Sequence, residues 1–437
     1  MASSKLLDGL PRGLRDRTWV TAKLAARLGY AAAKKNLGIG DTGEVDEGEA
    51  VKHAHDLVAQ MGSLKGLAMK VGQMASYLPG AMPPSAQKVL SELQASTVAM
   101  APALIVEQIE RELGKAPEQL FEAFEEAPFA AASIGQVHRA RLSGRDVAVK
   151  VQYPGIEEVL RGDLKTVGAL ATLSTVGTRV SGRAVADELR TRLLEECDYR
   201  IEARNQAVFA REIGKIRGAS VPGVVATHSR RRVLTSEFVH GKRFASFIDG
   251  STQELRDRAG AIVYEACFRP LFQHGLFNAD PHPGNYLFEG DGVTFLDFGC
   301  ARTFDRDFID RWKALALCVT DGDRARFPQR FSDAGFASIE DGKFDWDAQW
   351  AAIGVLYRPM RERDFRFSNE FVRETYDALL FRNPNKMRVG MPPEWLFLNR
   401  LQWGIFAILA QLRAGPNVHR IWREVIESKT DPLSLDP

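Results

Sequence analysis

Two short segments of the 437-residue chain carry side chains suited to phosphoryl transfer. Residues 278–285 read Asn-Ala-Asp-Pro-His-Pro-Gly-Asn, and residues 296–299 read Leu-Asp-Phe-Gly. Phosphoryl transfer needs one carboxylate that faces the attacking oxygen, together with an amide oxygen and a second carboxylate that hold metal ions on the nucleotide phosphates. The spacing therefore predicts a site for ATP and Mg²⁺, with Asp280 as the catalytic carboxylate and Asn285 and Asp297 as metal ligands.

A lysine at the end of an apolar strand is the predicted phosphate ligand. Residues 147–149 (Val-Ala-Val) are typical of a buried strand, and Lys150 follows them. In such a site a helical acid holds the lysine, and we expect Glu202 to do so. Several polar residues of segment 187–205 recur at steps of three and four and would share one helix face: Glu195, Asp198, Glu202 and Asn205. The alternative is an exposed acidic face that pairs with neighbouring arginines.

Further nucleotide contacts are predicted from an alanine-rich loop. Alanine carries a Cβ and disfavours positive φ, so this loop should be stiffer than a glycine-rich loop and should hold phosphates differently. The strand expected at 233–239 adds Glu237 and Val239, and His282 either approaches the terminal phosphate or caps its own loop. The residues assigned to the alanine-rich loop are Ala130, Ala131, Ala132, Ser133, Gly135 and Gln136.

The composition is that of a globular protein, with 45% apolar and 26% charged residues. A net charge of +2 gives no case for nucleic acid as a partner. Four scattered cysteines, without a Cys-x-x-Cys pair, argue against a zinc site and fit a reducing compartment, so we expect a cytoplasmic protein. The longest apolar stretch, residues 395–412, is interrupted by polar side chains and is predicted to be a buried helix rather than a membrane span.

The charge is concentrated at the N-terminus. Residues 1–40 hold eight lysines and arginines against two aspartates, which makes +6, so the remaining chain carries −4. This segment could lie on an anionic membrane surface as a peripheral contact. It could equally be a solvated helix packed on the protein, or a tail, and the sequence leaves these alternatives open.

The pattern of elements predicts four regions. They are a basic N-terminal helix or tail (1–45), a helical extension (46–127), a strand-rich lobe with the alanine-rich loop and Lys150 (128–240), and a mainly helical lobe with the two segments described first (241–437). Strands are expected at 130–141 and 146–151, and a hairpin at 285–298. The expected fold class is α+β with two lobes.

A helix predicted at 60–78 makes the chain recognisable. Its Lys70-Val71-Gly72-Gln73 resembles the Lys-x-Gly-Gln motif of the UbiB/AarF-type atypical kinases, and Glu196-Cys197-Asp198 resembles that family's acid-x-Asp motif. The resemblance also covers the alanine-rich loop, Lys150, Glu202 and the segments at 280–285 and 297–299. It runs from about residue 60 to at least residue 305, and residues 392–412 look like the family's C-terminal helix.

The resemblance implies a protein-kinase-like fold with a helical extension over the active site. Lys70 and Gln73 would enter the nucleotide site, and Glu196 and Asp198 would meet that motif or the metal. The family is linked to ubiquinone and other isoprenoid-lipid metabolism at membranes, with ATPase activity more evident than protein phosphorylation. The chain also lacks an Ala-Pro-Glu segment after residue 299, so a small or lipid-linked acceptor is expected rather than a protein.

Two other functions stay open from the residues. One is a small-molecule kinase of the aminoglycoside or choline type, which also uses an Asp…Asn loop. The other is an ATP-dependent, chaperone-like regulator of a lipid-biosynthesis complex. The helix with Lys70 and Gln73 and the alanine-rich loop favour the atypical kinase. The partners expected are a nucleotide and a lipid or quinone-like molecule, and oligomeric assembly is left open.

Overall fold

The computed structural model describes residues 100–132, 134–158, 160–161, 194–390, 392–415 and 417–435. The predictions for residues 1–99, which include the basic helix and the motif with Lys70 and Gln73, lie outside this range, as does Ser133. The chain forms two compact units. The first contains the described residues up to Ala203 together with Val224–Phe238, and the second contains Arg204–Gly223 and the residues from Val239 onward.

The first unit is built on an antiparallel sheet in the order β1-β3-β4-β6, with β2 paired to β3. The predicted strand at 130–141 is instead a hairpin, because the chain turns back just before residue 135. The strands are β1 (Ala123–Phe124), β2 (Ala130–Ala132), β3 (Gly135–Leu142), β4 (Arg145–Gln152) and β6 (Val233–Glu237). A 3-10 turn, η2 (Ala226–His228), precedes β6.

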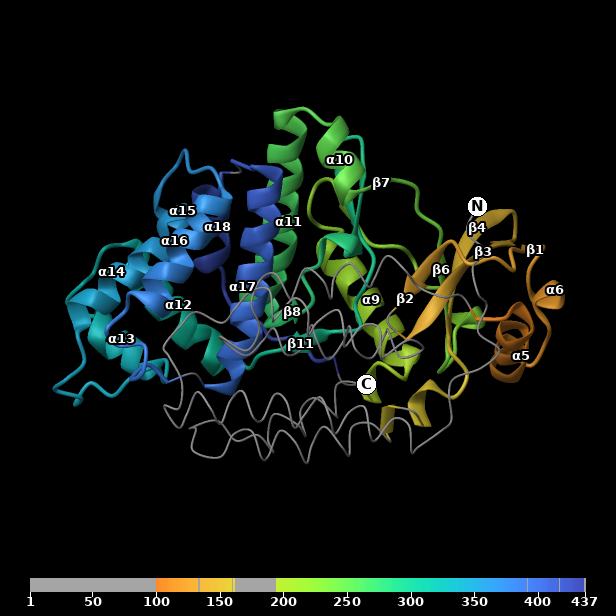
Figure 1. The fold of residues 1–437 in the computed structure, drawn as a ribbon, viewed down its shortest axis with the longest axis horizontal. Helices are drawn as coiled ribbons and strands as arrows, with labels where there is room; N and C mark the ends of the chain where they lie inside the picture. The colour runs from red at the N-terminus through yellow and green to blue at the C-terminus, as the bar shows by residue number, and fades with distance from the viewer. Residues whose placement is uncertain are drawn as a thin grey trace, which may run out of the picture. The chain divides into compact units, whose positions relative to one another are not determined.

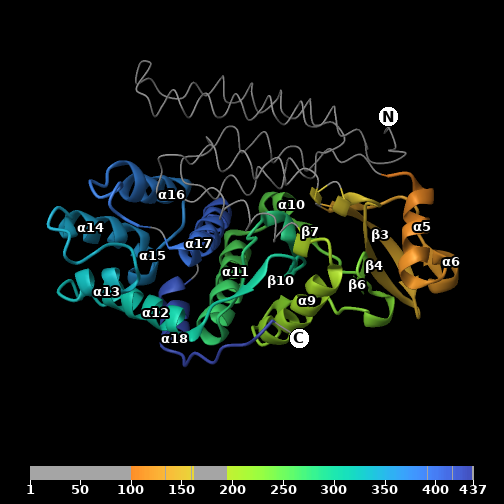
Figure 2. The same cartoon turned by 90° about the horizontal axis from the view of Figure 1, so that it is seen from below.

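Strand β4 directs Lys150 by simple alternation. Val147, Val149 and Val151 are buried and pack in one cluster with residues of α5 (Pro102–Leu113). Helices α5 and α6 (Pro117–Leu120) lie beside this sheet (Figures 1 and 2). Since successive side chains of a strand point to opposite faces, Lys150 projects from the face opposite to these valines.

The second unit is mainly helical. Its helices are α10 (Phe244–Gly250), α11 (Gln253–His274), α12 (Arg306–Thr320), α13 (Phe327–Asp333), α14 (Trp346–Leu356), α15 (Arg358–Arg361), α16 (Asn369–Tyr376), α17 (Pro393–Leu412) and α18 (Val418–Ile426), with a π-helical turn, η4 (Asp377–Phe381). Its short strands are β5 (Ala219–Ser220), β7 (Lys242–Arg243), β8 (Leu276–Asn278), β9 (Tyr286–Glu289), β10 (Gly292–Phe295) and β11 (Ala301–Thr303). Helix α9 (Tyr199–Ile213) begins in the first unit and continues in the second.

Helices α11 and α17 run side by side in the second unit (Figures 1 and 2). The prediction of a buried helix at 395–412 is confirmed, because α17 contributes Leu401, Ile405 and Leu409 to a large core. Within the described residues, no helix combines the length and the apolar character that crossing a bilayer requires. The predicted hairpin at 285–298 is also confirmed and is formed by β9 and β10.

A glycine at the end of α11 turns the chain toward the predicted catalytic loop. Gly275 has φ of 68°, and a Cβ there would overlap the carbonyl oxygen of Phe304. Only glycine meets both conditions without strain. Strand β8 follows at once and pairs with β11 in the register Asn278↔Ala301. This pairing holds the loop after β8 beside the Asp-Phe-Gly segment that precedes β11.

Candidate functional site

Lys150 and Glu202 form an ion pair in the first unit. The Lys150 Nζ lies 2.6 and 2.8 Å from the two carboxylate oxygens of Glu202, and their side chains are 18% and 8% exposed. The same Nζ lies 4.9 Å from the centre of the Tyr199 ring, a cation–π distance. The predicted contact is therefore present. Tyr199 was not predicted, since an aromatic residue at a helix start looks like ordinary core.

The predicted polar stripe on one helix face is wrong. Helix α9 begins only at Tyr199, so Glu195 and Asp198 precede it while Glu202 and Asn205 lie on it. Asp198 accepts a hydrogen bond from the backbone N–H of Arg200 at 3.0 Å and pairs with its guanidinium. Aspartate prefers this capping role to a place inside a helix, which is why the helix starts after it. Burial opposes ionisation of Asp198, but the bonds from Arg200 prevail and lower its pKa.

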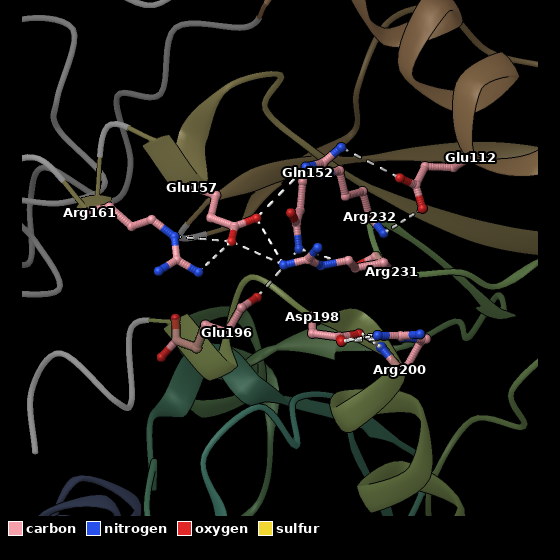
Figure 3. Close-up of polar contacts among 9 residues, drawn as sticks. All are labelled: Glu112, Gln152, Glu157, Arg161, Glu196, Asp198, Arg200, Arg231 and Arg232. Atoms are coloured by element: carbon pink, nitrogen blue, oxygen red, sulfur yellow. Dashed lines mark hydrogen bonds and ion pairs between the residues drawn. The ribbon is translucent and has the colours of Figure 1, made fainter.

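A network of charged side chains surrounds the start of α9 (Figure 3). Glu157 is its centre, because its carboxylate meets Arg161 at 2.9 Å, Arg231 at 3.0 Å and Arg232 at 3.7 Å. The carbonyl oxygen of Arg231 in turn accepts the backbone N–H of Tyr199 at 2.8 Å. The network thus anchors the first turn of the helix that carries the lysine's partner.

The acid-x-Asp motif is tied to the same network. The Gln152 side chain donates to the carbonyl oxygens of Glu196 (3.4 Å) and Arg231 (3.5 Å), both long hydrogen bonds (Figure 3). The Asp198 carboxylate is engaged by Arg200, as Figure 3 shows. A role of Glu196 and Asp198 toward a metal stays a prediction.

The alanine-rich segment is a tight hairpin. Ala132 pairs with Gly135 in β2 and β3, and a Cβ on Gly135 would overlap the carbonyl oxygen of Val151. Gln136 is 1% exposed, with its Oε1 accepting from Met100 N at 3.0 Å and its Nε2 2.9 Å from a ring nitrogen of His138. The Gln136 side chain is thus used within the protein, and its contact with a nucleotide stays a prediction.

The other predicted nucleotide contacts fall at the end of β6. Glu237 closes that strand opposite Val147, and Val239 follows two residues later. Val239 is the first residue of the second unit's long C-terminal segment. The structure thus places both residues at the point where the chain passes from one unit to the other.

The second unit brings Asp280, Asn285 and Asp297 together. Asn278 links the two segments, because its Nδ2 donates to the Asp297 carbonyl at 2.6 Å and its Oδ1 accepts from the Asp280 N–H at 3.1 Å. The N–H of Leu296 donates to the Asn285 carbonyl at 3.0 Å, which closes the β9–β10 hairpin. Asn278 was not predicted to act in the site, although it begins the conspicuous segment.

Asn285 is oriented by Asp280. Its Nδ2 donates to the Asp280 carbonyl at 3.1 Å and to Oδ2 of the carboxylate at 3.4 Å. The amide oxygen of Asn285 therefore faces away from Asp280. One carboxylate oxygen of Asp297 accepts the N–H of Gly299 at 2.9 Å. His282 caps its own loop by accepting the Gly284 N–H on Nδ1 at 3.0 Å, the second of its two predicted roles.

The phenylalanine of the Asp-Phe-Gly segment is packed inward. Phe298 is 1% exposed, and the centre of its ring lies 4.9 Å from the centre of the Phe209 ring on α9. The buried Asn205 donates to the Phe298 carbonyl at 3.0 Å. Helix α9 thereby fixes the backbone beside Asp297.

Arg400 of α17 is a site residue that the prediction missed. Its guanidinium forms an ion pair with Oδ1 of Asp280, and the two side chains are 17% and 13% exposed. Burial lowers the pKa of Arg400 to about 9, which leaves it cationic at neutral pH. A signal existed, because a charge inside an apolar helix needs a buried partner. The partner itself lies 120 positions away and could not be named from spacing.

The donor set suits a hard cation that keeps waters. Among the described residues no group of three His, Cys, Asp or Glu side chains could hold a metal ion by itself. One amide oxygen from Asn285 and one carboxylate oxygen from Asp297 fit Mg²⁺, because waters and phosphate oxygens commonly complete the coordination shell of this ion. A cavity of about 20 Å³ borders these residues and has room for one water molecule.

An antiparallel sheet with a lysine held by a helical acid, and a helical unit with an Asp…Asn loop before Asp-Phe-Gly, define a protein-kinase-like α+β protein. A family model described as the ABC1 atypical kinase-like domain matches residues 92–330. This is more than half of the 437 residues, and the chain belongs to this ABC1/UbiB family of atypical kinases.

Known relatives agree with this assignment. The chain is 30% identical to the mitochondrial atypical kinase COQ8B of Rattus norvegicus, over 93% of this chain and 83% of that protein. It is 26% identical to the mitochondrial atypical kinase COQ8 of Saccharomyces cerevisiae, over 97% and 86% respectively. The solved complex of Rv3197 with erythromycin from Mycobacterium tuberculosis is similar at a TM-score of 0.66 and 29% identity, over 87% of this chain and 97% of that chain.

Proposed function

We propose that this protein is a Mg²⁺-dependent, ATP-binding atypical kinase or ATPase that supports isoprenoid-quinone or other lipid metabolism. The phosphoryl acceptor is small or lipid-linked rather than a protein. The observation that carries the proposal is the hydrogen-bonded group of Asp280, Asn285 and Asp297, supported by the intact Lys150–Glu202 pair. The assignment to lipid metabolism rests on the family resemblance.

Each residue has a role in this proposal. Asp280 orients the attacking oxygen, while Asn285 and Asp297 hold Mg²⁺ and Lys150 binds nucleotide phosphate. Bound Mg²⁺ supplies neutralisation of the phosphate charge. The orientation of the Asn285 amide fits this role, because its nitrogen donates a hydrogen bond to Asp280 and its oxygen is directed elsewhere, where it can bind the metal. Lys70 and Gln73, outside the described residues, would gate the site.

The cellular location of the protein is part of the same proposal. The relatives are named mitochondrial, whereas the scattered cysteines of this chain fit a cytoplasmic protein. We propose a cytoplasmic location, with peripheral contact of the basic residues 1–40 to an anionic membrane as its route to a lipid-linked acceptor. Co-sedimentation with anionic vesicles at low and high salt tests this contact, because electrostatic binding is lost as salt rises.

Two substitutions test the enzymatic core. Asp297→Asn should abolish Mg²⁺-dependent binding of ATP, measured by calorimetry with and without the metal. Asp280→Asn should bind Mg·ATP like the wild type but lose turnover by about 10²–10⁴-fold, the range for a positioned acid–base group. Phosphate release, with mass spectrometry of added lipid and phenolic acceptors, measures turnover and reveals the acceptor. Unchanged metal-dependent binding by Asp297→Asn would contradict the proposal.

A further inference from the structure

The ion pair between Arg400 and Asp280 joins a core helix to the proposed catalytic carboxylate. Arg400 binds Oδ1, whereas Oδ2 lies on the side of Asn285. Asp280 therefore has one carboxylate oxygen committed to a cation and the other facing the proposed metal ligand. The ion pair therefore fixes the orientation of the Asp280 carboxylate, because a carboxylate without such a partner rotates about its soft terminal torsion.

The pair is built into the packing of the second unit. One turn after Arg400, Gly404 of α17 lies against Pro281, so closely that a Cβ at residue 404 would overlap the proline ring. Leu401, which follows Arg400, and Ile405, which follows Gly404, are 1% and 0% exposed. A helix held this tightly against the loop cannot withdraw its arginine without disrupting the core. The packing therefore favours a permanent contact over a releasable inhibitory contact.

We propose that Arg400 is a positioning residue for phosphoryl transfer. By holding Oδ1 of Asp280, it presents Oδ2 to the hydroxyl group or water molecule that attacks the phosphate. This inference rests on the proposed function and deepens it, since it assigns the residue that orients the catalytic carboxylate. Phosphoryl transfer depends on positioning more than on covalent chemistry by the protein, so an aspartate held in one orientation suits the step.

Kinetics of the purified full-length protein test this role. Arg400→Gln should keep the wild-type affinity for Mg·ATP and lower kcat on the order of 10²-fold, because a misplaced catalytic group costs about that much. Arg400→Lys should lose less, since it keeps the charge but lacks the planar fork of the guanidinium. Adding Arg400→Gln to Asp280→Asn should lower turnover no further, because Arg400 acts through Asp280.

The outcomes separate this inference from the proposed function. Failure of the wild type to bind Mg·ATP removes the proposed function itself. An active wild type with an inactive Asp280→Asn, but with Arg400→Gln at the wild-type rate or faster, overturns the role of Arg400 alone. An Arg400→Gln variant that loses nucleotide affinity, or that further impairs Asp280→Asn, overturns it as well.

Folding is checked in parallel. The exposed pair of Arg330 with Asp333 on α13 provides a matched control, and Arg330→Gln should leave both affinity and kcat unchanged. Where thermal unfolding shows that Arg400→Gln does not fold, Arg400→Lys decides. A reduced kcat at unchanged affinity supports the inference, and wild-type kinetics overturn it.

Discussion

At the scale of single residues, Arg400 holds the carboxylate of Asp280, and Asn205 holds the backbone beside Asp297. Lys150, Asp280, Asn285 and Asp297 stand in local patterns whose order along the chain is itself informative. Tyr199 and Arg400 stand in no such pattern. Their contacts depend on which segments meet in the folded chain, and no local sequence pattern reveals those meetings.

The Lys150–Glu202 pair gives a prediction at this scale. Glu202→Gln leaves Lys150 beside Tyr199 without its carboxylate, at a site where the side chains are 18% and 8% exposed. The lysine should then adopt other rotamers, so ATP affinity should fall while Asp297-dependent metal binding persists. Calorimetric titration with Mg·ATP measures this loss. Glu126→Gln, at an exposed position of the same unit, is the control. Equal ATP affinity in Glu202→Gln and wild type would refute the role of the pair.

At the scale of elements, periodicity located the strands and helices better than their ends. The apolar run at 147–149 predicted a strand at 146–151, and the interrupted apolar stretch at 395–412 predicted a buried helix, and these are β4 and α17. Two boundaries were wrong. The strand at 130–141 is a hairpin, and α9 starts after Asp198 because that aspartate caps the helix. Turns and caps are decided by a few local hydrogen bonds, which periodicity does not report.

The network around Glu157 should control the first turn of α9. Glu157→Gln removes the charge that meets three arginines, so the Arg231 carbonyl that binds Tyr199 loses its support. We expect faster hydrogen exchange at residues 199–203, measured by mass spectrometry. Arg111→Gln is the matched control, because its i,i+4 pair with Glu107 on α5 is exposed, lies outside this network and contributes little to stability. If both variants exchange like the wild type, the network does not anchor the helix.

At the scale of the whole molecule, both units depend on ionised carboxylates. Hydrogen bonding from Arg161 lowers the pKa of Glu157 in the first unit. In the second unit burial opposes ionisation of Asp257, yet bonds from Arg366 and the Gly415 N–H prevail and lower its pKa. A depressed folded-state pKa means that the unfolded chain takes up protons first. The stability from these groups is present above their unfolded pKa values of about 4 and is lost as pH falls further.

Urea unfolding between pH 7 and pH 3 tests this dependence. The midpoint should stay level down to about pH 5 and then fall, because the acids protonate preferentially in the unfolded chain. Asp257→Asn should flatten part of the fall, since it removes one of the responsible carboxylates. A midpoint that rises on acidification would show that other groups dominate.

The packing of Gly135 bears on how related chains are compared. Gly135 follows the three alanines 130–132 closely in the sequence and could be interpreted as the remnant of a phosphate-binding loop. In this fold the absent methyl group makes room for the Val151 carbonyl, and the Tyr199 hydroxyl lies nearby. An invariant glycine at the corresponding place in an alignment would thus record steric selection by the protein's own backbone. Differences in nucleotide preference between such chains would have to be sought at the alanine positions 130–132.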